Sequence, residues 1–180
     1  MKATGIVRRI DDLGRVVIPK EIRRTMRIRE GDPLEIYTSK EGEVIFKKYS
    51  LLGDLDDYAA QMCETMNKST GFTVAITDRD AVIAAAGVSR KELIGKTISE
   101  QLSQILEQRK IHQCEKGQPP LPVTEQNERH RVCVAAPVLS QGDTMGLVLF
   151  VAEDPDTQAG DAEYKLAQTI AAFLGKQMEA

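Results

Sequence analysis

The first 50 residues show the apolar alternation of a β-rich domain but contain few large apolar side chains. Two β-branched runs, residues 6–10 and 15–18, flank a turn cluster at residues 11–14. A short helix from Pro19 to Met26 and two further alternating segments follow, the last ending at Phe46. A domain of this size needs a metal ion, disulfides or a second chain to bury enough apolar surface. The segment therefore predicts a dimer.

The sign of the net charge changes near residue 50, where the β-rich segment ends. Residues 1–50 carry 12 Lys and Arg against 8 Asp and Glu, whereas residues 51–180 carry 12 against 19. The imbalance is largest in residues 1–29, where 9 basic residues face 3 acidic ones. Such asymmetry favours a polyanionic partner for the basic part, although a solvated basic surface is the alternative.

The short helix gathers cations on one side. At about 100° per residue, Lys20, Arg23, Arg24 and Arg27 share one arc of about 100°, while Ile22 points elsewhere. Like charges placed together repel one another, but opposite phosphates they form charge-assisted hydrogen bonds and release counterions. We therefore expect a nucleic-acid-binding surface, which nearby strand ends extend through Arg8, Arg9 and Arg15.

Residues 51–67 have the spacing of an amphipathic helix. The apolar positions recur at intervals of 3, 4, 3 and 4, as at the a and d positions of a coiled coil, and are Leu52, Leu55, Ala59, Met62 and Met66. Two heptads are compatible with a helix that packs on its own domain. They are equally compatible with a linker helix that pairs with a partner chain, which is our prediction.

Residues 68–180 read as an α+β domain that includes a C-terminal helix. Alternating runs predict a hairpin at 73–84, a helix at 99–110 capped by Ser99, and strands at 131–136 and 145–151. Prolines and glycine predict a long loop at 115–128. A final helix over 161–178 has a wide apolar stripe, of which Ile170, Phe173 and Leu174 are expected to contribute to oligomerisation.

No constellation of residues predicts an enzyme, a metal site or a cofactor. His112 and Cys114, with His130 and Cys133, supply four possible zinc ligands. On a strand, however, residues three apart point to opposite faces, so Cys133 reads as a core residue. The absence of a signal peptide, a membrane-spanning run and a disulfide framework predicts a cytoplasmic protein.

Residues 1–50 resemble the swapped-hairpin DNA-binding domain of AbrB-type bacterial transition-state regulators. The motif runs from Thr4 to Arg9 and from Asp11 through Pro19, continues at Ile22–Arg24, and closes at Gly31–Ile36. The sequence departs from it at Arg27, where many relatives have glycine, and at Met26, where leucine is usual. The resemblance implies that two chains exchange hairpins to form one interlaced barrel.

The same resemblance implies contacts to the phosphates and major groove of double-stranded, AT-rich DNA with a loose consensus. The positions that match the family's DNA-contacting arginines are Arg8, Arg15, Arg23 and Arg24. We add the neighbouring basic residues, so the expected DNA-binding set is Lys2, Arg8, Arg9, Arg15, Arg23 and Arg24.

Residues from about 56 to 178 resemble a GAF domain, through the segment Ala136–Val138, Gly142 and Met145–Leu149 between two helical ends. The signature of cyclic-nucleotide GAF domains is absent. The whole architecture is similar to regulators of sporulation, which implies a transcription factor that activates and represses late, forespore-stage genes. We expect a homodimer or homotetramer, associated with the nucleoid, with an unidentified small molecule under the loop at 111–128.

Two other functions remain open. The N-terminal fold also occurs in antitoxins, which usually end in a short disordered toxin-binding tail. A GAF-like thiol reductase could act on a small sulfoxide through Cys114 and Cys133.

Overall fold

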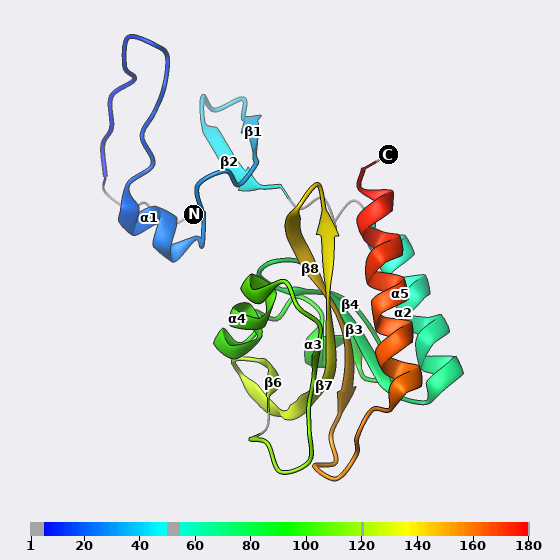
Figure 1. Cartoon of the computed structure of the whole chain (residues 1–180). Coiled ribbons are helices and arrows are strands. Elements are labelled where there is room, and N and C mark those ends of the chain that lie inside the picture. The colour runs from blue at the N-terminus through cyan, green and yellow to red at the C-terminus, as the bar shows by residue number, and fades with distance from the viewer. Residues whose placement is uncertain (1–5, 50–54, 120, 180) are drawn as a thin grey trace. The chain divides into compact units, whose positions relative to one another are not determined.

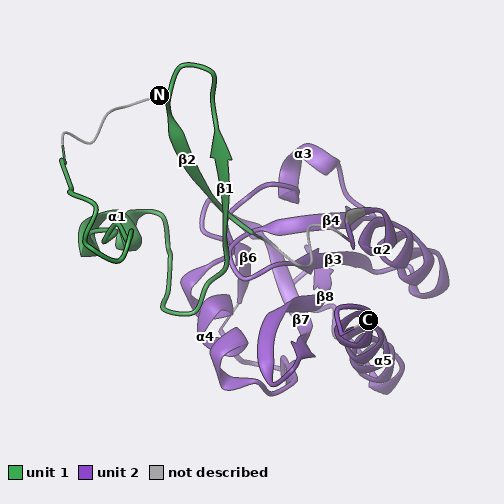
Figure 2. Cartoon of the chain, turned by 90° about the horizontal axis from the view of Figure 1, so that it is seen from above, with its two compact units in different colours: residues 1–49 green, residues 50–180 purple. Residues whose placement is uncertain are grey.

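The chain folds into two compact units, residues 1–49 and 50–180 (Figure 2). The computed structural model describes residues 6–49, 55–119 and 121–179. None of the described helices is both long enough and apolar enough to span a membrane.

In the first unit, the described residues 6–49 form one short helix and one antiparallel hairpin. Helix α1 covers Lys20–Thr25, and strands β1 (Leu34–Thr38) and β2 (Val44–Lys48) pair so that Ile36 lies opposite Phe46. The helix begins after Pro19, whose fixed φ suits a helix start. These elements match the predicted helix and the second pair of strands.

The predicted strands at 6–10 and 15–18 are not formed. These residues have no strand assignment, although the turn between them is present, with Gly14 N–H donating to the carbonyl of Asp11 at 2.9 Å. A strand requires a neighbouring backbone to satisfy its N–H and C=O groups, and a single chain supplies none for most of this segment.

The second unit is built on a six-stranded antiparallel sheet. Its main path is β4–β3–β8–β7–β5, and β6 also pairs with β7. The strands are β3 (Thr73–Thr77), β4 (Val82–Ala86), β5 (His112–Gln113), β6 (Pro122–Thr124), β7 (Asn127–Ser140) and β8 (Asp143–Ala152). A tight turn joins the two long central strands, with Gln141 at φ 50° and Gly142 at φ 87°.

Helices cover both faces of this sheet (Figure 1). On one face, α2 (Asp56–Thr70) and α5 (Asp161–Gln177) bury Ala59, Met66 and Leu174 against sheet residues such as Phe150. On the other face, α3 (Arg90–Leu93) and α4 (Glu100–Gln108) enclose a second apolar core. Ser99 caps α4 as predicted, because its Oγ accepts a hydrogen bond from Leu102 N–H at 3.1 Å.

Two boundaries differ from the prediction. The helix expected at 51–67 runs from Asp56 to Thr70, and Leu52 lies outside the described residues. The loop expected at 115–128 contains β6 and the first residues of β7. Prolines and charged side chains interrupt the alternation of apolar and polar residues here, so that pattern alone does not predict the hairpin of β6 and β7.

Candidate nucleic-acid interface

The cationic helix α1 ends in a left-handed residue. Ile28 N–H donates to the carbonyl of Arg23 at 2.7 Å and Arg27 N–H donates to that of Arg24 at 3.2 Å, the paired bonds of a Schellman motif. Arg27 itself adopts φ 52°, which explains why glycine is usual here in similar sequences. Arg23 and Arg24 are both exposed in the last turn, where their charges also suit the helix dipole.

The turn at 11–14 is organised by one carboxylate. Oδ1 of Asp11 accepts hydrogen bonds from the N–H groups of Leu13 and Arg15 at 3.0 and 2.8 Å, and its Oδ2 accepts from Arg15 Nε at 2.9 Å. These bonds from Arg15, backbone first and guanidinium second, lower the pKa of Asp11. The turn therefore fixes the base of the Arg15 side chain.

The first unit exposes most of its apolar side chains. Within residues 6–49, only Pro19 is buried. Of the large apolar side chains that are exposed in the described chain, thirteen lie in this unit and three in the other. Several line a groove of about 580 Å³ between the extended arms, α1 and β2, including Val17, Met26 and Phe46. An isolated domain that leaves this much apolar surface in water is incomplete.

The predicted DNA-binding residues are exposed wherever they are described. Arg8 and Arg9 lie in the first extended arm, Arg15 follows the turn, and Arg23 and Arg24 lie on α1. All belong to the first unit. Lys2 lies outside the described residues.

The predicted oligomerisation residues differ in their burial. Three of them point into the core of their own unit and are at most 1% exposed: Ala59, Met66 and Leu174. Met62 and Ile170 pack partly against the same core, and Leu55 is half-buried. Phe173 is 39% exposed on α5, and Tyr58 is 52% exposed on α2. On α2 the predicted spacing therefore places Ala59 and Met66 in the core of their own unit, while Tyr58 and Phe173 are exposed.

The second unit has a hollow beneath the loop that follows β5. Its volume is about 460 Å³, and its lining includes Cys114, Arg131 and Cys133. Cys114 Sγ lies 3.4 Å from His112 Nε2, whereas Cys133 Sγ donates to the carbonyl of Thr157 at 3.7 Å. Burial raises the pKa of Cys133 to about 11, and burial also raises the pKa of Cys114. Neither thiol has the depressed pKa of a reactive cysteine.

The four possible zinc ligands do not come together. His130 is fully buried and lies beside Glu92 and Glu153, away from the thiols. These two glutamates were not singled out from the sequence, because no motif spacing links positions 92, 130 and 153. The sequence signal that could have indicated nearby carboxylates is the pair of arginines, Arg129 and Arg131, on either side of His130.

Each of the two units is similar to a known protein family. Residues 54–179 match the family described as Stage V sporulation protein T C-terminal, transcription factor, and residues 7–51 match the family of the MazE bacterial antitoxin. Transition state regulatory protein AbrB of Bacillus subtilis is 63% identical over 49 residues, 27% of this chain and 50% of that protein. The GAF domain of an Acinetobacter phosphoenolpyruvate-protein phosphotransferase superposes with a TM-score of 0.55 at 14% identity, covering 74% of this chain and 84% of that domain.

The similarity also extends through the whole chain. Stage V sporulation protein T of Bacillus subtilis is 46% identical over 179 residues, covering 99% of both proteins. This match joins the AbrB-like unit to the GAF-like unit in one architecture, which confirms the predicted fold class. The chain belongs to the stage V sporulation protein T family of transcription factors.

Proposed function

We propose that this protein regulates sporulation genes by binding DNA through the cationic surface of a paired first unit. The observation that carries the proposal is the composition of that unit's surface. Five exposed arginines, Arg8, Arg9, Arg15, Arg23 and Arg24, accompany an apolar groove that the single chain leaves open. A second copy that exchanges its extended arms covers the groove and supplies the missing strand partners.

The DNA-binding residues act mainly on phosphates. Arginine presents a planar fork of donors that suits phosphate oxygens, and Arg23 and Arg24 are exposed in the last turn of α1. Lys2 completes the proposed set on the sequence argument alone. Loose consensus and AT-rich preference then follow from DNA deformability, because few base edges are read.

The second unit regulates and assembles the first. The hollow at Cys114 and Arg131 is large enough for a small-molecule effector, and exposed Tyr58 and Phe173 provide a pairing surface on the helical face. Two separate pairing surfaces generate a homotetramer. The protein works in the cytoplasm at the forespore nucleoid and both activates and represses late genes.

Two other functions are less well supported. An antitoxin usually ends in a short disordered tail, whereas residues 56–177 here form a sheet covered by helices on both faces. A thiol reductase needs a thiolate, and burial raises the pKa of both Cys114 and Cys133. Recovery of a bound toxin, or sulfoxide turnover that is lost in Cys114→Ser, would favour these alternatives.

The direct test is fluorescence anisotropy of an AT-rich duplex at two salt concentrations. We expect wild-type affinity to fall steeply with salt, and Arg23→Ala/Arg24→Ala to bind weakly with a smaller salt slope. Each arginine that no longer neutralises a phosphate reduces the slope by about 1, so the slope of a dimer decreases by up to about 4. The matched control is Lys91→Ala/Lys110→Ala, which removes two exposed charges from the second unit. Equal affinity of both double variants would refute the proposed surface.

A further inference from the structure

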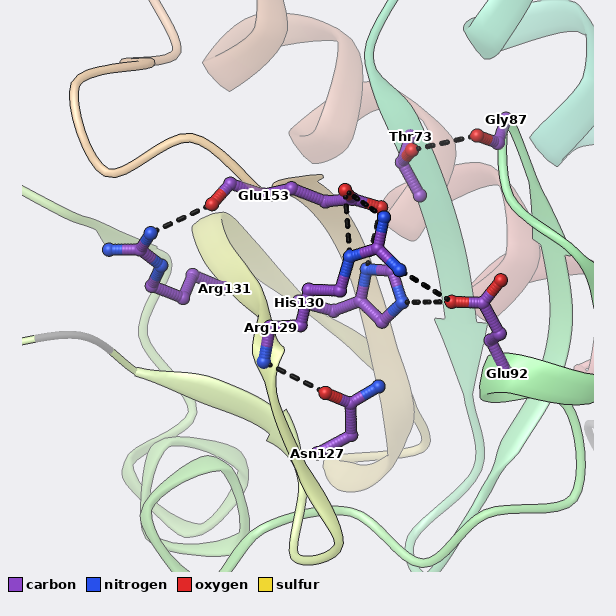
Figure 3. A network of polar contacts seen from close by, with 8 residues as sticks. All are labelled: Thr73, Gly87, Glu92, Asn127, Arg129, His130, Arg131 and Glu153. Carbon is purple, nitrogen blue, oxygen red and sulfur yellow. Dashed lines mark hydrogen bonds and ion pairs between the residues drawn. The ribbon is translucent and has the colours of Figure 1, made fainter.

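A buried histidine in the second unit lies between two carboxylates, and the regulatory function proposed above uses none of them. His130 of β7 is fully buried. Figure 3 shows its ring between the carboxylates of Glu92 and Glu153. Its Nε2 lies 3.0 Å from Oε2 of Glu92, which belongs to α3. Its Nδ1 lies 3.6 Å from Oε1 of Glu153, the residue after β8. Three segments far apart in the sequence thus converge on one imidazole.

The two sides of the ring differ. The 3.0 Å separation is that of a hydrogen bond, so we assign the proton to Nε2, which donates to Glu92. The 3.6 Å separation is too long for a hydrogen bond, and Nδ1 is a buried atom without a hydrogen-bond partner. In this tautomer Nδ1 carries a lone pair, which faces the oxygen of Glu153.

A metal ion between Nδ1 and Oε1 accounts for the longer of the two separations. Two ligands that each bind one Zn²⁺ at about 2.1 Å in tetrahedral geometry lie about 3.4 Å apart. A histidine that binds a metal through one nitrogen usually donates its other N–H to a carboxylate, the part played here by Glu92. We propose that Nδ1 of His130 and Oε1 of Glu153 bind a divalent transition-metal ion such as Zn²⁺, with Glu92 positioning the imidazole.

Neighbouring arginines hold Glu153 in place without covering its free oxygen. Arg129 donates from Nε at 2.9 Å, and its NH2 nitrogen lies 2.8 Å away, both at Oε2 of Glu153. Arg131 donates to the backbone carbonyl of the same residue at 2.7 Å. Oε1 is therefore the atom left to face His130, on a carboxylate whose position is fixed.

The Glu153 end of the proposed site is open to solvent. The side chain of Glu153 is 44% exposed. It also lines a depression of about 340 Å³ together with Thr73 and Asp154. With two protein ligands, the remaining positions belong to water, and an affinity weaker than that of a four-ligand structural site follows.

The experiment is a titration of the untagged full chain with Zn²⁺ by calorimetry and with Co²⁺ by absorption. We expect one ion per chain and a cobalt spectrum of nitrogen and oxygen ligands, without thiolate charge transfer. Glu153→Gln should weaken binding at least about 10-fold, since it removes a ligand. Glu92→Gln should weaken it by about 10-fold through the loss of imidazole orientation.

Controls separate this site from others. Glu64→Gln removes an exposed charge from α2 and should leave the affinity unchanged. His130→Gln should abolish metal binding if this variant folds. If it does not fold, Glu153→Gln, at a partly exposed position, provides the test of metal binding. The proposal is overturned if wild type binds neither ion, if Glu153→Gln binds as wild type does, or if a thiolate band assigns the cobalt to Cys114 or Cys133.

Discussion

A single residue limits the stability of helix α1. Arg27 occupies the left-handed position of the helix end, where a side chain costs about 1–2 kcal/mol relative to a right-handed residue. Arg27→Gly should remove this strain and stabilise the local fold by about 0.5–1 kcal/mol. Hydrogen exchange should show the gain as slower exchange of Ile28 N–H, which closes the motif.

Arg27→Ala is the matched control for this prediction. It removes the same guanidinium but keeps the Cβ, so the left-handed strain remains. Only the glycine variant should slow exchange. Equal protection in both variants would mean that the charge of Arg27, and not its backbone conformation, governs the stability of the helix end.

A second residue-scale prediction concerns Asp11. Its folded pKa is lowered, so its contribution to stability is present above the ordinary pKa of an aspartate and is lost as the pH falls through the lowered value. An NMR titration of the side-chain carboxyl should give an apparent pKa below the ordinary range. Arg15→Gln should shift that pKa upward, because the hydrogen bond from Nε is lost. Identical titrations in both proteins would show that Arg15 does not engage this carboxylate.

The helices and strands that are stabilised by contacts within one unit were predictable from local sequence patterns. Ser99 marked the start of α4, and alternation located β3, β4 and β8, because each pattern reflects burial within one unit. The arms at 6–18 lack strands because no neighbouring backbone within the described chain pairs with them. The apolar spacing at 51–67 predicted a helix, which α2 confirms. Spacing alone does not distinguish packing against the helix's own unit from packing against a second chain.

The candidate sites were predictable to different degrees. The arginine surface depends on helical periodicity and charge, which are properties of adjacent residues, so the sequence contains it. The Glu92–His130–Glu153 group depends on the pairing of β7 with β8 and on the position of α3. Such a group becomes visible only when the tertiary structure is known.

Helix α5 is fixed to the sheet by a close approach at Gly175. A Cβ at this position would collide with the backbone carbonyl oxygen of Leu139 in β7. Gly175→Ala should therefore lower the melting temperature of the second unit, at a cost of about 1–3 kcal/mol from overpacking. Ala172→Ser, at an exposed position of the same helix, should change stability by less than about 0.5 kcal/mol. An unchanged melting temperature for the alanine variant would show that α5 shifts freely on the sheet.

We expect the assembly of the whole molecule to depend on the two pairing surfaces proposed above. Val17 is 68% exposed and lines the groove of the first unit, whereas Phe173 is 39% exposed on the second. Burial of a carboxylate in either pairing surface is costly. We expect wild type to sediment as a tetramer, and each of Val17→Glu and Phe173→Glu to sediment as a dimer.

The two dimers should differ in function, which makes the assignment testable. The Phe173→Glu dimer retains the paired first units and should keep most of its DNA affinity per dimer. The Val17→Glu dimer is joined only through its second units, so its arginines no longer form one continuous surface and DNA affinity should fall at least about 10-fold, or about 1.4 kcal/mol. Sedimentation velocity and anisotropy on the same samples separate these cases. Full DNA binding by Val17→Glu would mean that the first unit recognises DNA without exchanging its arms.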